Sequence, residues 1–320
     1  MADFRQKEIL VTGGAGFIGS NFIQYILKNT SYTITNVDKI TYAGNWKNMI
    51  SFHSNSRYRF FQCDIANNEE LKKVFEKKYF AIINFAAETH VDRSIENAAP
   101  FIETNIQGTF NLLNYVLQGK AEKYIQISTD EVYGSLTEKA PSFTEKSPLS
   151  PNNPYSASKA AADLLVRSFY QTYQIPVMIT RCSNNYGPHQ HGEKLIPKII
   201  QHALQEKKIP LYGDGMNIRD WLFVEDHCSA ITMVLEGGIP GEIYNIGGNC
   251  EKTNKEVIQF ILDILGKPRN LIEHVTDRKG HDRRYSINYE KISAQIGWKP
   301  TVSFEEGIRK TIEWYKHHLG

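Results

Sequence analysis

The 320-residue sequence predicts an α/β protein in which a doubly wound parallel sheet carries a smaller, mixed C-terminal region. One observation is that short runs of β-branched and aromatic residues alternate with stretches of helical periodicity through the first half of the chain. Such alternation is typical of parallel strands joined by crossover helices that cover both faces of a sheet. A second observation is that the alternation stops after Arg181, where polar and turn-rich stretches take over.

The elements of the main sheet can be placed in order along the first half of the chain. Runs rich in Ile, Val, Tyr and Phe predict strands at 8–12, 32–37, 58–62, 80–84, 123–128 and 177–181. Apolar residues at helical spacing predict helices at 17–28, 98–117 and 155–173. A loop rich in Pro and Ser leads up to Pro154, before the last of these helices.

Beyond Arg181 the sequence predicts an irregular second region. Its polar, glycine-containing or highly charged stretches lie at 184–192, 210–220 and 277–284. Between them, two strands and a helix that are expected to return to the main sheet lie at 221–224, 243–246 and 225–236. We therefore expect one domain formed by 1–182 with 219–246, and a second formed by 183–218 with 247–320.

The composition excludes several classes of protein. Lys and Arg number 37 against 35 Asp and Glu, and a net charge of +2 gives no broad basic surface for nucleic acid or an anionic membrane. No run reaches the roughly 18 apolar residues of a membrane span, and the charged segment 1–8 lacks the apolar core of a signal peptide. The four cysteines are widely spaced, which predicts reduced thiols in a cytoplasmic protein rather than zinc ligands or disulfides.

A glycine-rich turn joins the first predicted strand to the first predicted helix. In its G-x-x-G-x-x-G pattern, Gly13 permits a tight turn, Gly16 lets a pyrophosphate approach the backbone, and Gly19 permits close helix packing. The pyrophosphate would lie at the positive end of the helix. Strand, turn and helix together predict a Rossmann dinucleotide site in the first domain.

Asp38 indicates which dinucleotide to expect. It follows the second predicted strand, where a carboxylate accepts hydrogen bonds from ribose hydroxyls and repels a 2′-phosphate, so NAD is expected rather than NADP. Asp64 and Ile65 follow the third strand and are expected near the adenine. Ala86 and Ala87 follow the fourth strand, where small residues let a dinucleotide lie against the backbone. The other residues expected at the cofactor are Phe17, Ile18, Lys39, Thr41 and Thr104.

A tyrosine and a lysine four residues apart offer acid–base chemistry. Tyr155 and Lys159 of YSASK lie on one face of the predicted helix 155–173. The Lys159 ammonium is expected to favour the phenolate and so lower the pKa of Tyr155. Such a tyrosine can take a proton from a sugar hydroxyl while hydride leaves the same carbon. Both side chains are also expected at the cofactor, with Lys159 on the nicotinamide ribose.

Together, several motifs resemble the extended short-chain dehydrogenase family throughout the chain. They are TGGAGFIGS (12–20), AAETHVDRSI (86–95), STDEVYG (128–134), YSASK (155–159), RCSNNYGP (181–188), RDWLFVEDH (219–227) and YNIGG (244–248). Within that family, the acidic pair Asp130 and Glu131 resembles the dTDP-glucose 4,6-dehydratases. Epimerases and decarboxylases of this fold usually lack such a pair.

The resemblance implies a reaction that needs two carboxyls. Tyr155 would be the base for the C4 hydroxyl of glucose, and Thr129 a hydrogen-bond donor near O4. Glu131 would remove the C5 hydrogen, and Asp130 would protonate the departing C6 hydroxyl. Because a general acid must be protonated, the site is expected to raise the pKa of Asp130. NAD would be regenerated in each turnover, with Asn185 as one of its ligands.

The resemblance also implies which side chains hold a nucleotide sugar. Lys194, Arg219 and Arg283 fall where relatives hold the diphosphate, a task that suits ammonium and guanidinium donors. The other residues implied at the substrate are Thr89, Thr129, Asn184, Leu195, Tyr212, Asn254 and Tyr285. The sequence leaves the base open between thymine, uracil and cytosine. The loop 135–153 is shorter than in several relatives, which bears on how the site is covered.

Three further expectations concern metals, assembly and alternative functions. No metal is expected, because His189 and His191 lie in a polar loop without a carboxylate at helical spacing and the chemistry needs no metal. The apolar helices 98–117 and 155–173 predict a homodimer, since relatives pair such helices across a two-fold axis. The alternatives are a nucleotide-sugar epimerase or decarboxylase on the same scaffold, and an inactive cofactor-sensing or interaction protein. The acidic pair with Tyr155 and Lys159 argues against both.

Overall fold

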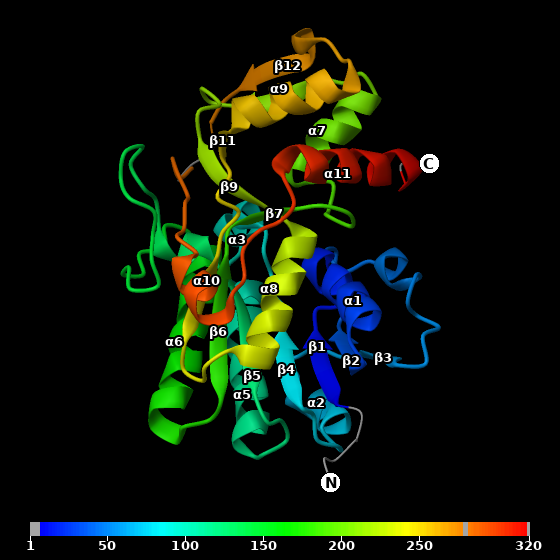
Figure 1. Ribbon diagram of the computed structural model, residues 1–320, viewed down its shortest axis with the longest axis vertical. Helices are drawn as coiled ribbons and strands as arrows, with labels where there is room; N and C mark the ends of the chain where they lie inside the picture. Colours follow the sequence, from blue (N-terminus) through cyan, green and yellow to red (C-terminus); the bar gives the residue numbers. More distant parts are fainter. Residues whose placement is uncertain (1–6, 278–280, 319–320) are drawn as a thin grey trace.

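The computed structural model describes residues 7–277 and 281–318, in which a large layered body carries a smaller lobe at one end (Figure 1). The main sheet has seven parallel strands in the order β10-β6-β5-β4-β1-β2-β3. They are β1 (Glu8–Thr12), β2 (Thr33–Asp38), β3 (Tyr58–Gln62), β4 (Ala81–Asn84), β5 (Tyr124–Thr129), β6 (Val177–Cys182) and β10 (Ile243–Ile246). The strand order reverses between β1 and β4, and open α/β sheets bind ligands beyond the carboxyl ends at such a point.

Helices cover both faces of this sheet, which confirms the predicted doubly wound fold. Successive side chains of a strand point to opposite faces. Ile9 and Val11 of β1 therefore belong to one core, with helices α1 (Phe17–Asn29) and α8 (Val224–Gly237). Leu10, between them, belongs to the core on the other face. The helices there are α2 (Asn68–Val74), α5 (Thr109–Leu117) and α6 (Pro154–Tyr173).

The helix predicted over 98–117 contains a π-helical segment. The structure has α4 (Ala99–Phe101), then π-helix η2 (Ile102–Gly108), then α5, where regular α-helix was expected. Such segments are rare and frequently lie at functional sites. Here the segment carries Asn105, whose Nδ2 lies 3.1 Å from the backbone oxygen of Glu88 and 2.8 Å from Ser158 Oγ. Asn105 thus ties the loop that follows β4 to helix α6.

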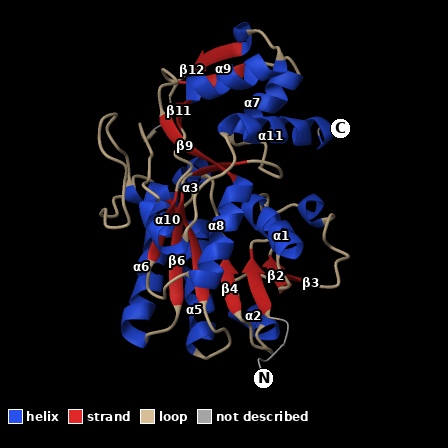
Figure 2. Cartoon of the chain, in the orientation of Figure 1, coloured by secondary structure: helices blue, strands red, loops and turns tan. Residues whose placement is uncertain are grey.

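The smaller lobe, called the upper lobe below, consists of two short sheets and three helices (Figure 2). The order β11-β9-β7 joins β11 (Glu251–Thr253), β9 (Ile218–Phe223) and β7 (Asn184–Tyr186). The parallel pair β12-β8 joins β12 (Ile272–Val275) and β8 (Ile209–Tyr212). The helices are α7 (Leu195–Leu204), α9 (Asn254–Leu265) and α11 (Phe304–His318), and they share a core of their own.

Two expectations about the second half of the chain are wrong. The strand predicted at 221–224 was expected in the main sheet, but β9 pairs with β7 and β11 instead, and β7 lies inside a stretch read as a turn. The physical reason is that periodicity indicates a strand but not its partner. By contrast α8 and β10 do return to the main sheet as expected. Helix α10 (Glu290–Ile296) returns as well, packing against β10 and α8.

The chain crosses between the main sheet and the upper lobe several times. Strand β6 leads into β7, β9 leads into α8, and β10 leads towards β11. The ends of these strands therefore lie where the two parts meet, on the carboxyl side of the main sheet (Figure 1). In the described ranges, none of the helices is both long and apolar enough to span a bilayer.

Candidate active site

The glycine-rich turn is shaped by its glycines and leaves helix α1 open at its N-terminus. Gly13 has φ +73°, and a Cβ there would lie 2.6 Å from the backbone nitrogen of Ala86. A Cβ on Gly19 would lie 2.3 Å from the carbonyl oxygen of Gly13. The N-cap of α1 is Gly16, which supplies no capping side chain. The first backbone N–H groups of α1 are thus available to an anion.

Asp38 holds the backbone beside this turn. Its carboxylate accepts from the backbone nitrogens of Ala15 at 2.9 Å and Ile40 at 2.8 Å. Burial raises the pKa of Asp38, and these two hydrogen bonds oppose that rise. Nearby, Lys39 Nζ lies 3.3 Å from Asp64 Oδ2 and 3.2 Å from Thr104 Oγ1. These contacts bring together residues that the sequence separates widely.

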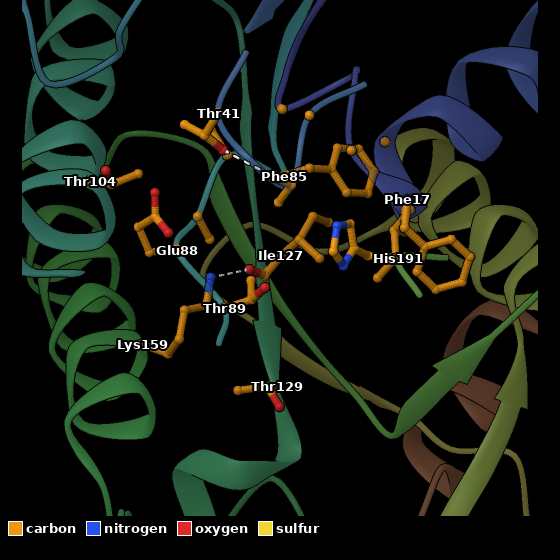
Figure 3. Close-up of a pocket in the computed structure, with 18 of the residues that line it drawn as sticks. Phe17, Thr41, Phe85, Glu88, Thr89, Thr104, Ile127, Thr129, Lys159 and His191 are labelled. Carbon is orange, nitrogen blue, oxygen red and sulfur yellow. Dashed lines mark hydrogen bonds between the residues drawn. The ribbon is translucent and has the colours of Figure 1, made fainter. Parts of the chain in front are cut away.

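One cavity of about 290 Å³ joins the glycine-rich turn to the candidate catalytic residues. Its lining includes every residue that the sequence analysis assigned to the cofactor: Gly13, Gly16, Phe17, Ile18, Gly19, Asp38, Lys39, Thr41, Asp64, Ile65, Ala86, Ala87, Thr104, Tyr155, Lys159 and Asn185. In Figure 3, Phe17 and Thr41 lie in the upper half of the view, and Lys159 and Thr129 lie in the lower half. The cavity thus runs from the uncapped N-terminus of α1 to a set of titratable side chains.

Thr129, Asp130 and Glu131 lie on this cavity at the carboxyl end of β5. The backbone turns there into a 3₁₀ segment, capped by Thr129 Oγ1, which accepts from Glu131 N at 3.3 Å. Asp130 is 2% exposed, and within the described residues its Oδ2 has no hydrogen-bond partner. Burial, followed by the charges of Glu131 and Asp220, raises the pKa of Asp130 well above its usual range. This agrees with the expectation that the site keeps Asp130 protonated.

Glu131 has a different electrostatic setting. Burial raises its pKa, but the positive charges of Lys194 and Arg219 oppose the rise. Ser156 Oγ also donates to Glu131 Oε2 at 3.4 Å, which favours the carboxylate. Two adjacent carboxyls in different environments can serve as an acid and a base at the same pH.

Tyr155 and Lys159 lie on the same cavity, but their electrostatics differ from expectation. Lys159 Nζ donates to the backbone oxygen of Ile127 at 2.6 Å, as the dashed line in Figure 3 shows. The pKa of Tyr155 is raised well above its usual range, first by burial and then by the charge of Glu131, and the Thr129 hydroxyl opposes this. The predicted lowering by Lys159 is therefore wrong for this structure. The physical reason is that burial outweighs a cation whose ammonium is directed at a carbonyl.

The residues implied at the substrate fall into two groups. Thr89, Thr129, Asn184 and Lys194 line the cavity, and Lys194 Nζ donates to the backbone oxygen of Thr89 at 3.3 Å. The others do not line it: Leu195, Tyr212, Arg219, Asn254, Arg283 and Tyr285. Leu195 and Asn254 begin helices α7 and α9, and Tyr212 ends β8.

Arg219 and Arg283 are in contrasting environments. Arg219 is buried, lies 4.4 Å from the ring of Tyr285, and lowers the pKa of both Asp130 and Glu131. Arg283 is more exposed, and its guanidinium contacts Asp214 at 2.9 Å and Glu138 at 3.0 Å. Arg219 therefore belongs to the electrostatic surroundings of the acidic pair, whereas Arg283 is held between two surface carboxylates.

The comparisons with known proteins agree with this geometry. The family model described as GDP-mannose 4,6 dehydratase matches residues 10–311. A curated relative, the dTDP-glucose 4,6-dehydratase of Haemophilus influenzae, is 49% identical over 328 residues, covering 96% of this chain and 97% of the relative. This chain belongs to the dTDP-glucose 4,6-dehydratase family.

Solved dehydratases of this family share the fold closely. The Bacillus anthracis enzyme, in complex with NAD, has a TM-score of 0.91 at 52% identity, covering 97% of each chain. The Streptomyces venezuelae enzyme, with NAD and dTDP bound, has a TM-score of 0.94 at 46% identity, covering 98% of each. The UDP-glucose 4-epimerase of Thermotoga maritima also reaches 0.91, but at 28% identity. The fold alone therefore does not separate dehydratases from epimerases, and the site residues must do so.

Sequence reasoning missed several residues that line the cavity of this dehydratase-family chain. They include Phe85, Glu88, Ile127, Ser128, Cys182, Ser183, Gln190, His191 and Glu193. Most follow or end a parallel strand, so the rule that sites lie at carboxyl ends would have found them. His191 was considered only as a metal ligand, and Figure 3 instead shows its ring directed at the cavity.

Proposed function

We propose that this chain dehydrates dTDP-glucose to dTDP-4-keto-6-deoxyglucose and uses NAD as a cofactor regenerated in each turnover. The observation that carries the proposal is that Asp130, Glu131 and Tyr155 line the same cavity as the glycine-rich turn. A hydride acceptor, two carboxyls and a phenol are the groups that this reaction requires. The high identity to dehydratases named for dTDP-glucose supports thymine as the base.

The residues present fit NAD. The open N-terminus of α1, beginning after Gly16, suits the pyrophosphate. A Cβ at Gly13 would collide with the backbone of Ala86, and one at Gly19 with the carbonyl oxygen of Gly13. Asp38 is placed to accept from ribose hydroxyls and to repel a 2′-phosphate. When bound, NAD would supply the hydride acceptor for the oxidation at C4 and the hydride donor for the later reduction at C6.

In this scheme Tyr155 and Glu131 each accept one proton, and Asp130 gives one up. Tyr155 removes the proton of the C4 hydroxyl, assisted by Thr129 as a donor near O4. The resulting ketone acidifies the hydrogen at C5, which Glu131 removes. Asp130, protonated because of its burial beside two carboxylates, donates to the C6 hydroxyl so that it leaves as water. Lys159 and Asn185 hold the nicotinamide end of the cofactor.

The nucleotide sugar would extend from the cavity into the upper lobe. Thr89, Asn184 and Lys194 line the cavity, so we assign them to the sugar and diphosphate. The remaining residues assigned to the nucleotide lie beyond the cavity, in the upper lobe or beside it: Leu195, Tyr212, Arg219, Asn254, Arg283 and Tyr285. In this proposal 1–182 with 219–246 bind NAD, and 183–218 with 247–320 bind the nucleotide sugar.

Glu131→Gln tests the proposal most directly. The variant keeps the size of the side chain but removes the base, so C4 can be oxidised while C5 keeps its hydrogen. On mixing with dTDP-glucose, reduced nicotinamide absorbance should build up while product formation falls about 10²–10⁴-fold. Tyr155→Phe should give no reduced cofactor, and Glu69→Gln, an exposed change on α2, should behave like the wild type.

Isotopes give an independent readout on the wild type. In deuterated water the product should carry deuterium at C5, and deuterium placed on C4 of the substrate should appear at C6. Normal turnover by Glu131→Gln, or a product without solvent deuterium at C5, would show that the role of Glu131 is wrong. A product retaining the C6 hydroxyl would instead favour the alternative, an epimerase or decarboxylase.

We also propose that two copies of this chain form a homodimer. Large apolar side chains on η2, α5 and α6 stand exposed in the single chain: Ile102, Phe110, Leu117, Leu164 and Tyr173, at 55%, 39%, 43%, 56% and 51%. They lie on the two helices expected to pair across a two-fold axis. Leu164→Glu should therefore lower the mass measured by light scattering from dimer to monomer. Wild-type protein that is monomeric at micromolar concentration would exclude this assembly.

We further propose a cytoplasmic enzyme that supplies 4-keto-6-deoxy sugars such as rhamnose precursors. The four cysteines, Cys63, Cys182, Cys228 and Cys250, are free thiols, which suits a reducing compartment. The class of product, a 4-keto-6-deoxy sugar, follows from the chemistry proposed above. Growth-stage labelling of 6-deoxy sugars in a strain lacking the protein would test this role.

A further inference from the structure

His227 and Asn185 form a hydrogen-bonded pair behind the cavity. His227 lies near the start of α8 and is fully buried, with 0% exposure. Its ring Nδ1 lies 2.9 Å from Oδ1 of Asn185. Asn185 belongs to β7 and lines the cavity, whereas His227 does not. Within the described residues, the hydrogen bond that links His227 to the cavity lining runs through Asn185.

The surrounding contacts fix the orientation of both side chains. Asn185 Nδ2 lies 3.0 Å from the backbone oxygen of Ser183, and a carbonyl can only accept. Asn185 Oδ1 must therefore be the atom facing His227, so Nδ1 of His227 carries the hydrogen. Nε2 of His227 is then a bare lone pair, and it has no hydrogen-bond partner in the described part of the chain.

The backbone at Asn185 is held as well. Gln190 Nε2 donates to the backbone oxygen of Asn185 at 2.9 Å. One N–H of the Asn185 amide is engaged by Ser183, and its oxygen is engaged by His227. The second N–H of the amide is the polar group that remains for the cavity.

We propose that His227 is a positioning residue that holds the Asn185 amide so that the cavity meets an N–H donor rather than a carbonyl acceptor. That donor binds the carboxamide oxygen of the nicotinamide and so sets which way the ring faces. The inference rests on the proposed function in one respect, namely that NAD is the cofactor. An unpaired buried nitrogen on His227 is the cost of keeping a donor in this place, since a buried polar atom without a partner is unfavourable.

The pair is expected to be insensitive to pH. Burial alone lowers the pKa of His227 to about 3, and no charged group contributes to that shift. The ring is therefore neutral wherever the enzyme is assayed, and its hydrogen bond to Asn185 persists. This separates the role of His227 from that of the titrating groups Asp130 and Glu131.

The experiment measures NAD binding and needs no sugar substrate. His227→Leu removes the donor at similar volume, and His227→Asn returns an amide N–H close to the place of Nδ1. Thr232→Val is the matched control, because Thr232 is buried on the same helix and, in the part of the chain that the structure describes, its hydroxyl donates to the backbone oxygen of Cys228. For His227→Leu we expect NAD affinity to fall about tenfold or more. His227→Asn and Thr232→Val should bind NAD within about twofold of the wild type.

A double-mutant cycle distinguishes positioning from a general loss of structure. If His227 acts through Asn185, then His227→Leu should weaken NAD little further once Asn185→Ala is present. Additive losses, or His227→Leu with wild-type NAD affinity, would overturn the inference. If His227→Leu does not fold, His227→Asn still tests the proposal. Weak NAD binding by that folded variant would contradict it. A wild type that binds NAD but forms no 4-keto sugar would refute the proposed function and leave this test intact.

Discussion

Asp163→Asn tests the buried ion pair behind the catalytic helix. Asp163 lies one turn beyond Lys159 on α6, and its Oδ2 is 2.9 Å from Nε of Arg181. The side chains are 1% and 4% exposed, so water screens neither charge. Asn keeps the shape of Asp163 but removes its charge. Arg181, which cannot lose its proton, is then left buried without a counter-charge.

The expected cost follows from that burial. Removing one partner of a buried ion pair costs about 3–5 kcal/mol, against a total stability of about 5–15 kcal/mol. The substitution also acts on Lys159, whose pKa burial lowers and the charge of Asp163 raises. Without Asp163 the pKa of Lys159 should fall further. If activity needs the Lys159 ammonium, raising the pH should therefore abolish the activity of the variant at a lower pH than that of the wild type.

Urea unfolding of the variant and the wild type measures the first effect, and a pH–rate profile measures the second. The matched control is Glu242→Gln, which breaks the ion pair of Glu242 with Lys291 at 2.6 Å. Those side chains are 42% and 23% exposed, so the control should cost about 0–1 kcal/mol. If Asp163→Asn unfolds within about 1 kcal/mol of the wild type, the buried pair does not behave as argued here.

Three further substitutions test other parts of the site. Asp220 accepts hydrogen bonds from Gly248 N and Cys250 N, and its charge raises the pKa of Asp130. Asp220→Asn should therefore lower the pKa of Asp130, so that activity is lost at a lower pH on the alkaline side. An unmoved pH–rate profile would contradict this. Gly19→Ala puts a Cβ 2.3 Å from a carbonyl oxygen, so purified protein should retain little NAD, and normal retention would refute the steric argument. Asp38→Ala should weaken NAD binding and relax discrimination against NADP, whereas equal wild-type affinities for the two dinucleotides would exclude the ribose assignment.

Local patterns predicted which residues line the cavity around the glycine-rich turn. The turn Gly13–Gly19 and Asp38 were found because a strand, a turn and a helix adjacent in sequence specify that geometry. Asp64 and Ala86 were found because they follow strands whose carboxyl ends meet at one edge. The acidic pair Asp130 and Glu131 depended on resemblance, since a pair of carboxyls after a strand is not distinctive by itself.

What the sequence could not predict depends on contacts between distant segments. Neither the partners of β9 nor the π-helical segment at Ile102–Gly108 leaves a periodic signal. The raised pKa of Tyr155 comes from burial, and burial is set by everything packed around α6. Gln190 and His191 line the cavity directly after His189, whose backbone is left-handed with φ +69°, and no glycine at that position marks the turn in the sequence.

The repeated crossings between the main sheet and the upper lobe also govern how the protein is made. During synthesis the strands from β1 to β6 emerge first, and the edge of β6 stays uncovered until β10 follows β7, β8, β9 and α8. An uncovered strand edge is a template for association with other chains. The upper lobe likewise cannot finish its three-stranded sheet before β11 arrives, so neither part is a continuous piece that could be expressed alone. A chain cut after Cys182 should therefore aggregate rather than fold as a smaller dinucleotide-binding protein.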